Sequence, residues 1–295
     1  MQNNPKSVKL AIIGGGAAGM FAAAAAAERN LGCVLFERKA RIGSKVLMTA
    51  NGRCNFTKDI SVDDFLADLG PSAGWASAAL RDCPPRRIIQ FFRSLGIPLR
   101  RMADARMFPA DGKAATIVHA FGDIMRDCGV PLLTNSAVKR ITKKESLFIV
   151  ETENFGITAE NVLVTTGGVS YPKTGSVGDG QRFAKELGHK IVPLRPGLIG
   201  METGDRRITS LAGRRFEDAR AKVISPDGKT LFDYRGEVDC ENFGLSGAAI
   251  YNSQRYIMHA GLKDFTLEVW IGHERMQFQN LHNYFYWIPL LSYIL

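Results

Sequence analysis

The sequence predicts an α/β fold together with a second, partly β domain, from three observations. An apolar run over residues 8–13 stops at three consecutive glycines and is followed by an alanine-rich, helix-forming segment over 20–28. A second apolar run, Cys33–Phe36, completes a strand, turn, helix and strand within about 30 residues, the length of a βαβ unit. Prolines and a glycine over 193–197 then indicate a change of domain.

Further elements follow in order along the chain. Prolines at 84 and 85 open a helix whose apolar residues recur three and four positions apart, and Gly96 closes it. The same spacing predicts a helix over 114–128, which ends at a glycine. We also expect strands over 147–150 and 162–164, a helix over 179–187, and a hairpin of 216–224 and 230–232 around the turn 225–228.

The composition is that of a globular protein, with 45% hydrophobic and 23% charged residues in 295. No apolar stretch reaches the roughly 20 residues of a membrane-spanning helix, and residues 1–9 lack the apolar core of a secretory signal. The five cysteines lie far apart, which argues against a disulfide framework, a dithiol redox pair and a metal site. We therefore expect a cytoplasmic protein with reduced thiols, no membrane span and no metal.

The net charge of +9 is partly local. From Arg81 to Arg106 the chain carries seven arginines but only two acidic residues, Asp82 and Asp104. A basic face of this kind attracts phosphates, nucleic acid or an acidic substrate. The alternative is a solvated surface without a specific ligand, and the sequence leaves both interpretations open.

The pattern Gly14-x-Gly16-x-x-Gly19 lies between the first predicted strand and the first predicted helix. In that context the first glycine makes a tight turn, the second lets the backbone approach a pyrophosphate, and the third allows close packing of helix on strand. Amide groups at the start of the helix then face the phosphates. Glu37 ends the second strand, where a carboxylate can accept hydrogen bonds from an adenosine ribose. The sequence therefore predicts a dinucleotide site.

This pattern alone does not distinguish NAD from FAD. An acid at position 37 disfavours a 2′-phosphate, although the adjacent Arg38 keeps NADP open. A later apolar run over 162–164 leads into Thr165, Thr166 and Gly167, so a second strand ends in small residues. Because such a turn brings the chain back to the dinucleotide in two-part flavoproteins, we favour FAD.

Further motifs form an ordered series from about residue 8 to residue 255. They are GGGAAG at 14–19, GSKVL at 43–47, GRCN at 52–55, RMFP at 106–109, TGGVSYPKTGS at 166–176, GDG at 178–180, GH at 188–189 and GLSG at 244–247. In this order the series resembles the BaiN-like, aminoacetone-oxidase-like family of FAD-dependent oxidoreductases. An ordered series of this length is far more specific than any one of its motifs.

The resemblance implies a Rossmann-type FAD-binding domain with an inserted, partly β second domain. It also implies an oxidoreductase that transfers hydride between the flavin and a small organic substrate, with NAD(P)H as a candidate reductant. The expected FAD contacts are Gly14, Gly15, Gly16, Ala17, Ala18, Gly19, Glu37, Lys45, Gly52, Arg53, Cys54, Asn55, the backbone near Val138, Thr166 and Gly167, and we add Arg38 because it follows Glu37. Asn51 departs from the family pattern, which has a glycine there.

The flavin would carry out the hydride chemistry, so no catalytic residue is assigned. Lys45 and Arg53 are candidates for positive charge beside the pyrophosphate or the reduced ring, with a plain surface charge as the alternative. Cys54 is expected to pack rather than to react. Tyr171 and Lys173, in the loop beside the second turn, are candidate acids.

We assign residues 1–194 to the FAD-binding domain and 195–295 to an inserted, substrate-side domain. The resemblance implies that family members continue beyond residue 295 and return to the flavin domain, so we interpret this chain as truncated. The aromatic tail from about residue 272 is atypical of the family, and the alternative is a tail that docks on a partner or a membrane surface.

Two other classes of function remain open. A flavoprotein that acts on or binds nucleic acid would hold phosphates with the arginines between residues 81 and 106, and its binding would weaken steeply as salt rises. A truncated, non-catalytic flavin-binding remnant would follow from the missing return segment. The sequence defines neither the substrate nor the oligomeric state.

Overall fold

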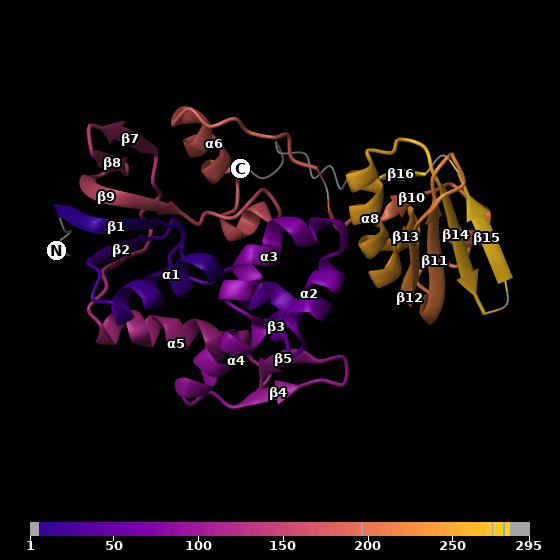
Figure 1. Cartoon of the computed structure of the whole chain (residues 1–295), viewed down its shortest axis with the longest axis horizontal. Coiled ribbons are helices and arrows are strands. Elements are labelled where there is room, and N and C mark those ends of the chain that lie inside the picture. Colours follow the sequence, from indigo (N-terminus) through magenta and orange to yellow (C-terminus); the bar gives the residue numbers. More distant parts are fainter. Residues whose placement is uncertain (1–5, 196, 273, 280, 284–295) are drawn as a thin grey trace. The chain divides into compact units, whose positions relative to one another are not determined.

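The computed structural model describes residues 6–195, 197–272, 274–279 and 281–283 (Figure 1). The chain divides into two compact units, one formed by Met1–Val62 with Asp82–Val192 and the other by Asp63–Arg81 with Pro193–Leu295. Each unit has a hydrophobic core of its own. Within the described residues, no helix has both the length and the apolar character needed to cross a membrane.

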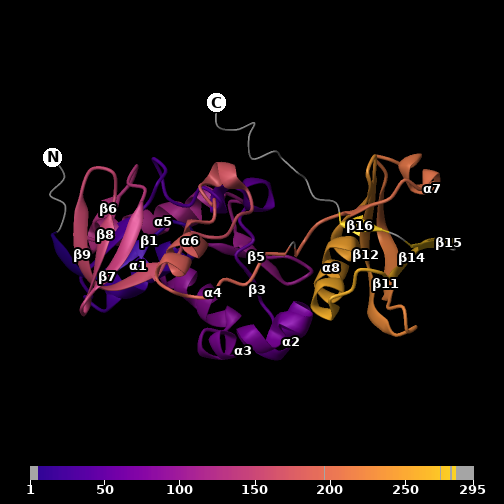
Figure 2. The ribbon, with the colours of Figure 1, turned by 90° about the horizontal axis from the view of Figure 1, so that it is seen from above.

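A six-stranded sheet forms the centre of the first unit, in the order β6-β2-β1-β9-β8-β7. Four strands are parallel to one another, and an antiparallel hairpin extends the sheet at one edge (Figure 2). The parallel strands are β6 (Leu132–Leu133), β2 (Cys33–Phe36), β1 (Ser7–Ile13) and β9 (Gly156–Val164), and the hairpin strands are β7 (Arg140–Lys144) and β8 (Leu147–Glu151). All four residues of β2 are buried, as its uninterrupted apolar sequence predicts for a strand covered on both faces.

One face of this sheet packs against three helices, α1 (Ala17–Glu28), α4 (Pro85–Ser94) and α5 (Ala114–Asp127). In Figure 1, α1 and α5 lie together on that side of β1 and β2. Small alanine side chains let α1 approach the sheet closely. An aromatic cluster joins the helices, with the Phe21 and Phe121 rings 4.8 Å apart and the Phe91 and Phe92 rings 5.3 Å apart.

On the opposite face of the sheet, a second core joins side chains of the parallel strands with Ile141 and Val150 of the β7–β8 hairpin and with α6 (Asp179–Glu186), whose Phe183 is buried. Two short helices and a small second sheet complete the unit. They are the 3-10 helices η1 (Val46–Gly52) and η3 (Pro172–Thr174), and a small sheet of β3 (Thr57–Lys58), β5 (Arg106–Pro109) and β4 (Leu99–Arg101) in the order β3-β5-β4.

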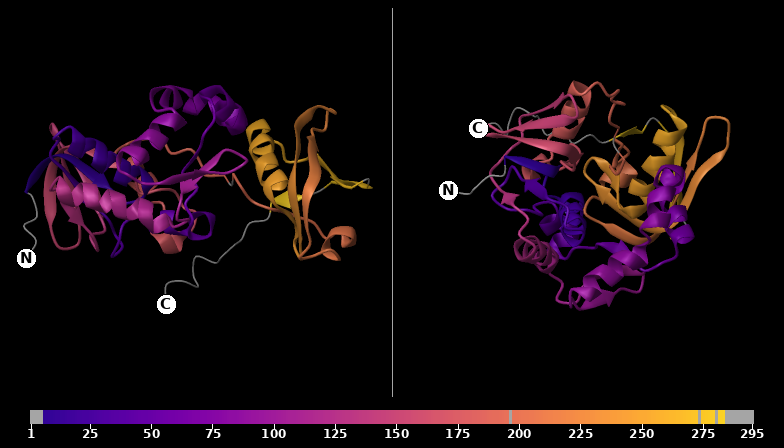
Figure 3. Two further views of the ribbon diagram at one scale, coloured as in Figure 1. Left: turned by 90° about the horizontal axis from the view of Figure 1, so that it is seen from below. Right: turned by 60° about the vertical axis from the view of Figure 1, so that its left-hand side comes forward.

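The second unit is an antiparallel sheet with the helix α8 (Ala248–Ala260) along one face (Figure 3). Its order is β15-β14-β11-β12-β13-β10-β16. The strands are β10 (Met201–Glu202), β11 (Arg215–Ile224), β12 (Thr230–Glu241), β13 (Gly244–Ser246), β14 (Thr266–Ile271), β15 (Glu274–Phe278) and β16 (His282–Asn283). The shorter helices are α2 (Val62–Leu69), η2 (Gly70–Ser72), α3 (Ala73–Asp82) and α7 (Arg206–Thr209).

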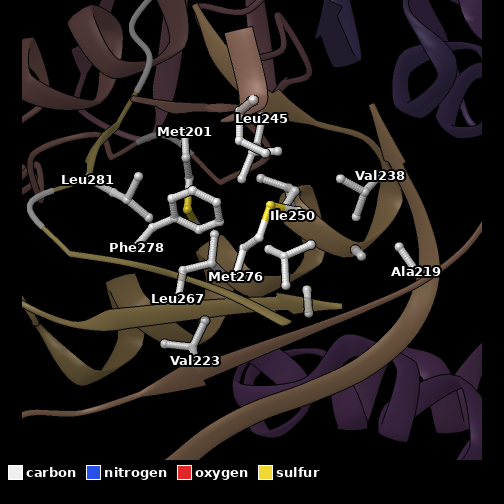
Figure 4. Close-up of a cluster of buried hydrophobic side chains, with 14 of the residues drawn as sticks. Met201, Ala219, Val223, Val238, Leu245, Ile250, Leu267, Met276, Phe278 and Leu281 are labelled. Carbon is white, nitrogen blue, oxygen red and sulfur yellow. The ribbon is translucent and has the colours of Figure 1, made fainter. Parts of the chain in front are cut away.

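The core of the second unit lies between its sheet and α8. Ile250 of α8 is fully buried among strand side chains that include Val238, Leu245 and Leu267 (Figure 4). On the other face of the same sheet, charged side chains pair across the strands, as Arg220 of β11 does with Asp233 of β12. The alternation of apolar and charged residues along β11 therefore separates a core face from a solvent face.

The prediction of an α/β fold with a second, partly β unit is confirmed. The predicted helices and the strands β1, β2 and β8 occur close to their predicted bounds, whereas β9 begins at Gly156 instead of 162 and β12 continues to Glu241 instead of 232. Four α-helices, α2, α3, α7 and α8, were not predicted, nor were the small sheet of β3, β4 and β5 and the last strands. Helix α8 lacks a clear apolar stripe because two of its fully buried residues, Ser253 and Gln254, are polar. The predicted atypical tail falls largely outside the described residues, although β15 and β16 lie within the same stretch.

Candidate functional site

The carboxyl ends of three parallel strands meet at the candidate site. Ile13, the last residue of β1, stands in register with Phe36 on one side and Val164 on the other. The glycine turn after β1, the acid after β2 and the turn after β9 therefore lie at one edge of the sheet. In open α/β sheets this edge is where ligands bind.

Two glycines of the turn are required by the packing of the protein itself. Gly14 has a φ of 110°, and a Cβ there would lie 2.7 Å from the Thr165 carbonyl oxygen. A Cβ at Gly19 would overlap the Gly14 carbonyl oxygen, because α1 passes directly over the turn. These are the tight turn and the close helix–strand contact that the glycine pattern predicts.

Gly16 is different, because the protein leaves open space where its side chain would be. Its φ is −77°, and a Cβ there would meet only the Thr165 carbonyl oxygen, at 4.0 Å. Gly16 is also the N-cap of α1, and no side chain caps the helix there. The first amide groups of a helix have no partner inside the helix. The turn therefore presents a free space lined by N–H donors, which fits the pyrophosphate of a dinucleotide.

Glu37 is fixed against this turn by two backbone amides. Its Oε2 accepts a hydrogen bond from Gly15 N at 2.8 Å, and its Oε1 accepts one from Lys39 N at 2.8 Å. The side chain is buried, with the residue 9% exposed. Each carboxylate oxygen has a second lone pair, so the group keeps acceptor capacity for ribose hydroxyls.

Arg38 is engaged with another part of the same unit. Its Nη1 donates to Asp179 Oδ2 at 2.9 Å and to the Gly175 carbonyl oxygen at 3.3 Å. The side chain thus ties the end of β2 to the start of α6. Its guanidinium is occupied by these acceptors.

Lys45 holds together the loop that follows the turn after β9. Its Nζ donates to the Ser170 carbonyl oxygen and to Ser176 Oγ, both at 2.8 Å. Burial lowers the pKa of Lys45, because a desolvated ammonium group is less stable. A Cβ at Gly167 would stand 3.9 Å from Lys45 Nζ, so the ammonium group lies beside the turn after β9.

The turn after β9 contains two features that a ligand would explain. The Thr166 hydroxyl is buried and has no hydrogen-bond partner among the described residues. At Gly168, a Cβ would meet nothing within 4 Å. Thr165, by contrast, shares its hydroxyl proton between the carbonyl oxygens of Gly14, at 2.8 Å, and Ile13, at 3.1 Å. Thr165 therefore joins the two turns, whereas Thr166 retains an unused hydrogen-bonding group.

A strained loop begins within the last residues of η1, where the backbone is no longer helical. Ala50, Asn51, Gly52 and Cys54 all have φ between 49° and 83°, a region that side chains other than those of glycine and asparagine rarely adopt. The departure from the family pattern at Asn51 is thereby explained, because asparagine tolerates this conformation best among non-glycine residues. Four such residues so close together are typical of a functional loop.

The side chains of this loop divide between the core and the surface. Cys54 is 4% exposed, and burial raises the pKa of its thiol, although a hydrogen bond with Thr49 acts in the opposite direction. The Arg53 Nε donates to the Ala50 carbonyl oxygen at 3.0 Å, and its guanidinium lies 5.6 Å from the centre of the Phe108 ring. Asn55 is exposed. The contacts of Arg53 thus join this loop to β5.

The segment around Val138 runs beside Glu37. Ser136 N donates to the Glu37 carbonyl oxygen at 2.9 Å, and Asn135 N donates to that of Lys39, also at 2.9 Å. Val138 itself is buried in the core on the β7–β8 side of the sheet. The backbone near Val138 is therefore close to the acid that ends β2.

The structure thus gathers the glycine turn, Glu37, Lys45, Thr166 and Gly167 at one sheet edge. Sequence reasoning missed Thr165, which links the two turns, and Ser170 and Ser176, which accept hydrogen bonds from Lys45. Both serines lie inside the motif at 166–176, so the motif located this loop but not its contacts. Among the described residues, no group of three or more histidine, cysteine or acidic side chains could hold a metal ion.

Tyr171 in this loop is unusual in two ways. Its φ is 54°, and the residue is 66% exposed although it is a large aromatic. Its carbonyl oxygen accepts hydrogen bonds from Thr174 N at 2.9 Å and from Thr174 Oγ1 at 2.7 Å. The loop therefore holds Tyr171 in a conformation that an aromatic residue rarely adopts.

Fold and site together define a dinucleotide-binding α/β protein of the Rossmann type. The chain belongs to the HI0933-like family, whose Rossmann-domain description matches residues 8–258.

Two curated relatives show how far this similarity extends. The chain is 29% identical over 252 residues to a 3-dehydro-bile acid delta(4,6)-reductase of Clostridium scindens, covering 84% of this chain and 60% of the relative. It is 28% identical over 273 residues to the ribosomal RNA dihydrouridine synthase of Escherichia coli, covering 90% of this chain and 66% of the relative. The chain therefore spans about two thirds or less of the length of these relatives.

A solved structure supports the fold. The open conformation of a flavocytochrome c3 fumarate reductase is similar with a TM-score of 0.50 and 17% sequence identity. The similarity covers 73% of this chain and 48% of that structure. At this identity the likeness concerns the fold alone.

Proposed function

We propose that this chain is the FAD-binding part of an oxidoreductase that transfers hydride between the flavin and an organic substrate. The observation that carries the proposal is the open position at Gly16. The protein's own packing does not need a glycine at position 16. A pyrophosphate bound at the start of α1 would need a glycine there, so that the backbone can approach it closely. Membership of the HI0933-like family supports the same function.

Residues at the sheet edge have distinct roles in this proposal. The amide groups of Gly16, Ala17 and Ala18 bind the pyrophosphate at the positive end of α1. Glu37, already oriented by two backbone amides, accepts hydrogen bonds from the adenosine ribose. The unpaired Thr166 hydroxyl and the open Gly168 receive the part of the cofactor that runs along the turn after β9.

FAD supplies the hydride chemistry when it is bound, and the protein orients the reactants and excludes water. Lys45 contributes by fixing the loop 170–176 beside the second turn. Its ammonium group also brings positive charge to that turn, which favours an anion there. Tyr171 presents its exposed ring from the same loop, and we infer that the ring contacts the substrate. NAD(P)H is the proposed reductant.

The relatives suggest the kind of bond that reacts. A delta(4,6)-reductase and a dihydrouridine synthase both add hydrogen across carbon–carbon double bonds. We therefore propose that the substrate of this chain is an unsaturated compound that accepts hydride at carbon. A small-molecule substrate is the first candidate.

An absorption spectrum of the purified chain tests the cofactor. We expect the near-ultraviolet and visible bands of an oxidised flavin, and their loss when NADH or NADPH is added without oxygen. Heat release followed by chromatography then identifies FAD or FMN. A folded, colourless protein that added FAD cannot reconstitute would contradict the proposal.

A second candidate substrate is a nucleobase in RNA. The specific observation in its favour is the group of exposed arginines on α4 and β4. The stretch of chain between Asp82 and Asp104, which contains both elements, has no acidic residue. The E. coli relative, named for ribosomal RNA, has a substrate of this class. Mass spectrometry of RNA incubated with the reduced protein would detect this activity as a gain of two hydrogen masses.

A further inference from the structure

The helix α4 has one buried face and one arginine face. Pro85, Ile89 and Phe92 are buried, and their spacing of four and three residues puts them on one side of the helix. The exposed positions include Arg86, Arg87, Gln90 and Arg93. Every one of these exposed side chains can donate a hydrogen bond, and none is negatively charged.

The strand β4 adds two further exposed arginines. Only residues 95–98 separate it from α4, and its Arg100 and Arg101 are both exposed. The stretch 83–103 contains Arg86, Arg87, Arg93, Arg100 and Arg101 and no aspartate or glutamate. We call these five residues the arginine surface. All five belong to the first unit.

Four of these arginines are not neutralised by a carboxylate of the described residues. Arg86, Arg93 and Arg100 make no ion pair with a carboxylate within the part of the chain that the structure describes, whereas Arg101 pairs with Asp59 at 3.3 Å. Arg87 donates only to a backbone carbonyl oxygen, that of Asp82, at 3.2 Å. Four positive charges therefore face solvent without a carboxylate partner.

Several other exposed arginines of the chain have acidic partners. Arg126 on α5 is 70% exposed and pairs with Asp123 at 2.8 Å and with Asp127 at 3.2 Å. On β11, Arg215 and Arg220 pair with aspartates of β12. The arginine surface is distinguished by the concentration of its charges, because four arginines without a carboxylate partner among the described residues lie within residues 86–100 and no acidic residue lies between them. Such a field attracts polyanions from a distance.

The arginine surface stands on a rigid support. The Phe92 side chain of α4 is 1% exposed and contacts the rings of Phe21, Phe56, Phe91 and Phe121 at centroid distances of 4.9 to 5.8 Å. A helix anchored in this way holds the backbone positions of its arginines fixed. Arginines on a fixed backbone bind phosphates with less loss of entropy than arginines on a flexible tail do.

We propose that the arginine surface binds the phosphate backbone of RNA. Arginine forks match phosphate oxygens, and Gln90 and Ser94 between them offer further hydrogen bonds to phosphate and sugar. A membrane surface is a poorer partner, because the aromatic side chains of α4 point into the core and none is left to insert among lipids. The choice of RNA among polyanions rests on the second candidate function above.

RNA binding is measured by the fluorescence anisotropy of a labelled single-stranded RNA of mixed sequence, over a series of salt concentrations. The variant replaces three of the four arginines that lack a carboxylate partner, Arg86→Gln, Arg93→Gln and Arg100→Gln. We expect its affinity to fall by about tenfold or more at low salt, and the slope of log K against log salt to decrease by about 2, because three phosphate contacts are lost. Arg126→Gln, at an exposed arginine that two aspartates neutralise, is the matched control and should leave both values unchanged.

Three results would overturn the proposal. They are equal RNA binding by the triple variant and the wild-type chain, an equal loss with Arg126→Gln, and wild-type binding to vesicles of anionic phospholipid but not to RNA. Thermal unfolding of each variant shows that it is folded, and titration with FAD separates this proposal from the proposed function. A wild-type chain that binds RNA but no FAD contradicts only the proposed function, and the converse result contradicts only the RNA proposal.

Discussion

The amide of Gly15 donates a 2.8 Å hydrogen bond to Glu37 Oε2, a residue 22 positions further along the chain. This bond makes the glycine turn and the acid after β2 one structural unit. The second oxygen of the same carboxylate is held by the amide of Lys39, also at 2.8 Å. The acid that the sequence identifies as a ribose ligand therefore also builds the turn that faces the phosphates.

The first prediction concerns Glu37→Gln. A glutamine offers only one acceptor oxygen to the two amides, so one backbone N–H would face the side-chain NH2 group and lose its partner. We expect the free energy of unfolding to fall by about 1–3 kcal/mol, the cost of a buried unsatisfied donor. Urea titration of the protein without ligand measures it. Glu28→Gln, at an exposed position of α1, should change stability by less than about 0.5 kcal/mol, and an equal effect there would contradict the account.

The second prediction separates strain from function at Tyr171. Because its φ is 54°, Tyr171→Gly should stabilise the protein by about 1 kcal/mol, the typical cost of a non-glycine residue in this region. Tyr171→Ala removes the same ring but keeps the strain, so it should leave stability nearly unchanged. Both variants should lower turnover to a similar extent if the ring contacts the substrate. Unfolding curves and steady-state rates for the two variants check this, and unchanged turnover in both would remove Tyr171 from the site.

The third prediction is a pH dependence at the solvent face of the second unit. Hydrogen bonds from the Arg220 guanidinium to the Asp233 carboxylate lower the pKa of Asp233. The pair therefore contributes stability above the unfolded-state pKa of about 3.9, and this contribution is lost as the pH falls through the lower folded-state pKa. Its magnitude should stay below about 1 kcal/mol, because both side chains are more than a third exposed and solvent screens them.

The measurement compares Asp233→Asn with the wild-type chain by urea unfolding between about pH 6 and about pH 2.5. The two proteins should differ at the higher pH and converge at the lower. Asp218→Asn is the control, because Asp218 and Arg235 are both more than 70% exposed and their pair should contribute less. A difference that grows as the pH falls would contradict the assigned sign.

The fourth prediction concerns the cysteines. Cys83 and Cys128 are exposed, whereas Cys33, Cys54 and Cys240 are buried and burial raises the pKa of each buried thiol. A raised pKa leaves little thiolate to react. In the native protein, iodoacetamide should therefore modify Cys83 and Cys128 first, and the other three only after unfolding, as mass spectrometry of the peptides would show. Early labelling of Cys54 would mean that the loop around residues 50–55 opens in solution.

The central sheet could be predicted because its signals are local. The apolar run of β2 ends where the sequence indicates, and α4 begins at the proline pair and ends before Gly96. Helix α1 begins three residues earlier than its apolar pattern indicated, because Gly16 serves as its N-cap without offering a capping side chain. The apolar pattern shows which residues are hydrophobic, so it cannot locate a helix start at which no side chain caps the first amide groups.

The contacts of the site could be predicted only in part. The glycine turn and Glu37 follow from a local motif, whereas the hydrogen bonds of Lys45 to Ser170 and Ser176 join residues more than 120 positions apart. The periodicity of the sequence cannot predict such a contact, because the contact depends on the pairing of β1 with β9 in the folded sheet. The role of Thr165 in joining the two turns was missed for the same reason.

The most direct test of the central claim is FAD binding by Gly16→Ser. A serine at this N-cap can hydrogen-bond the first amide groups of α1, so the chain without ligand should be as stable as the wild type or slightly more so. The same side chain would occupy the space and the donors that the pyrophosphate needs. Gly122→Ser, at a position of α5 where a Cβ also meets nothing within 4 Å, is the matched control.

The account predicts that titration with FAD gives binding to the wild-type chain and to Gly122→Ser, and an affinity for Gly16→Ser that is weaker by about tenfold or more, equivalent to about 1.4 kcal/mol. Undiminished binding of FAD to a folded Gly16→Ser variant would contradict it.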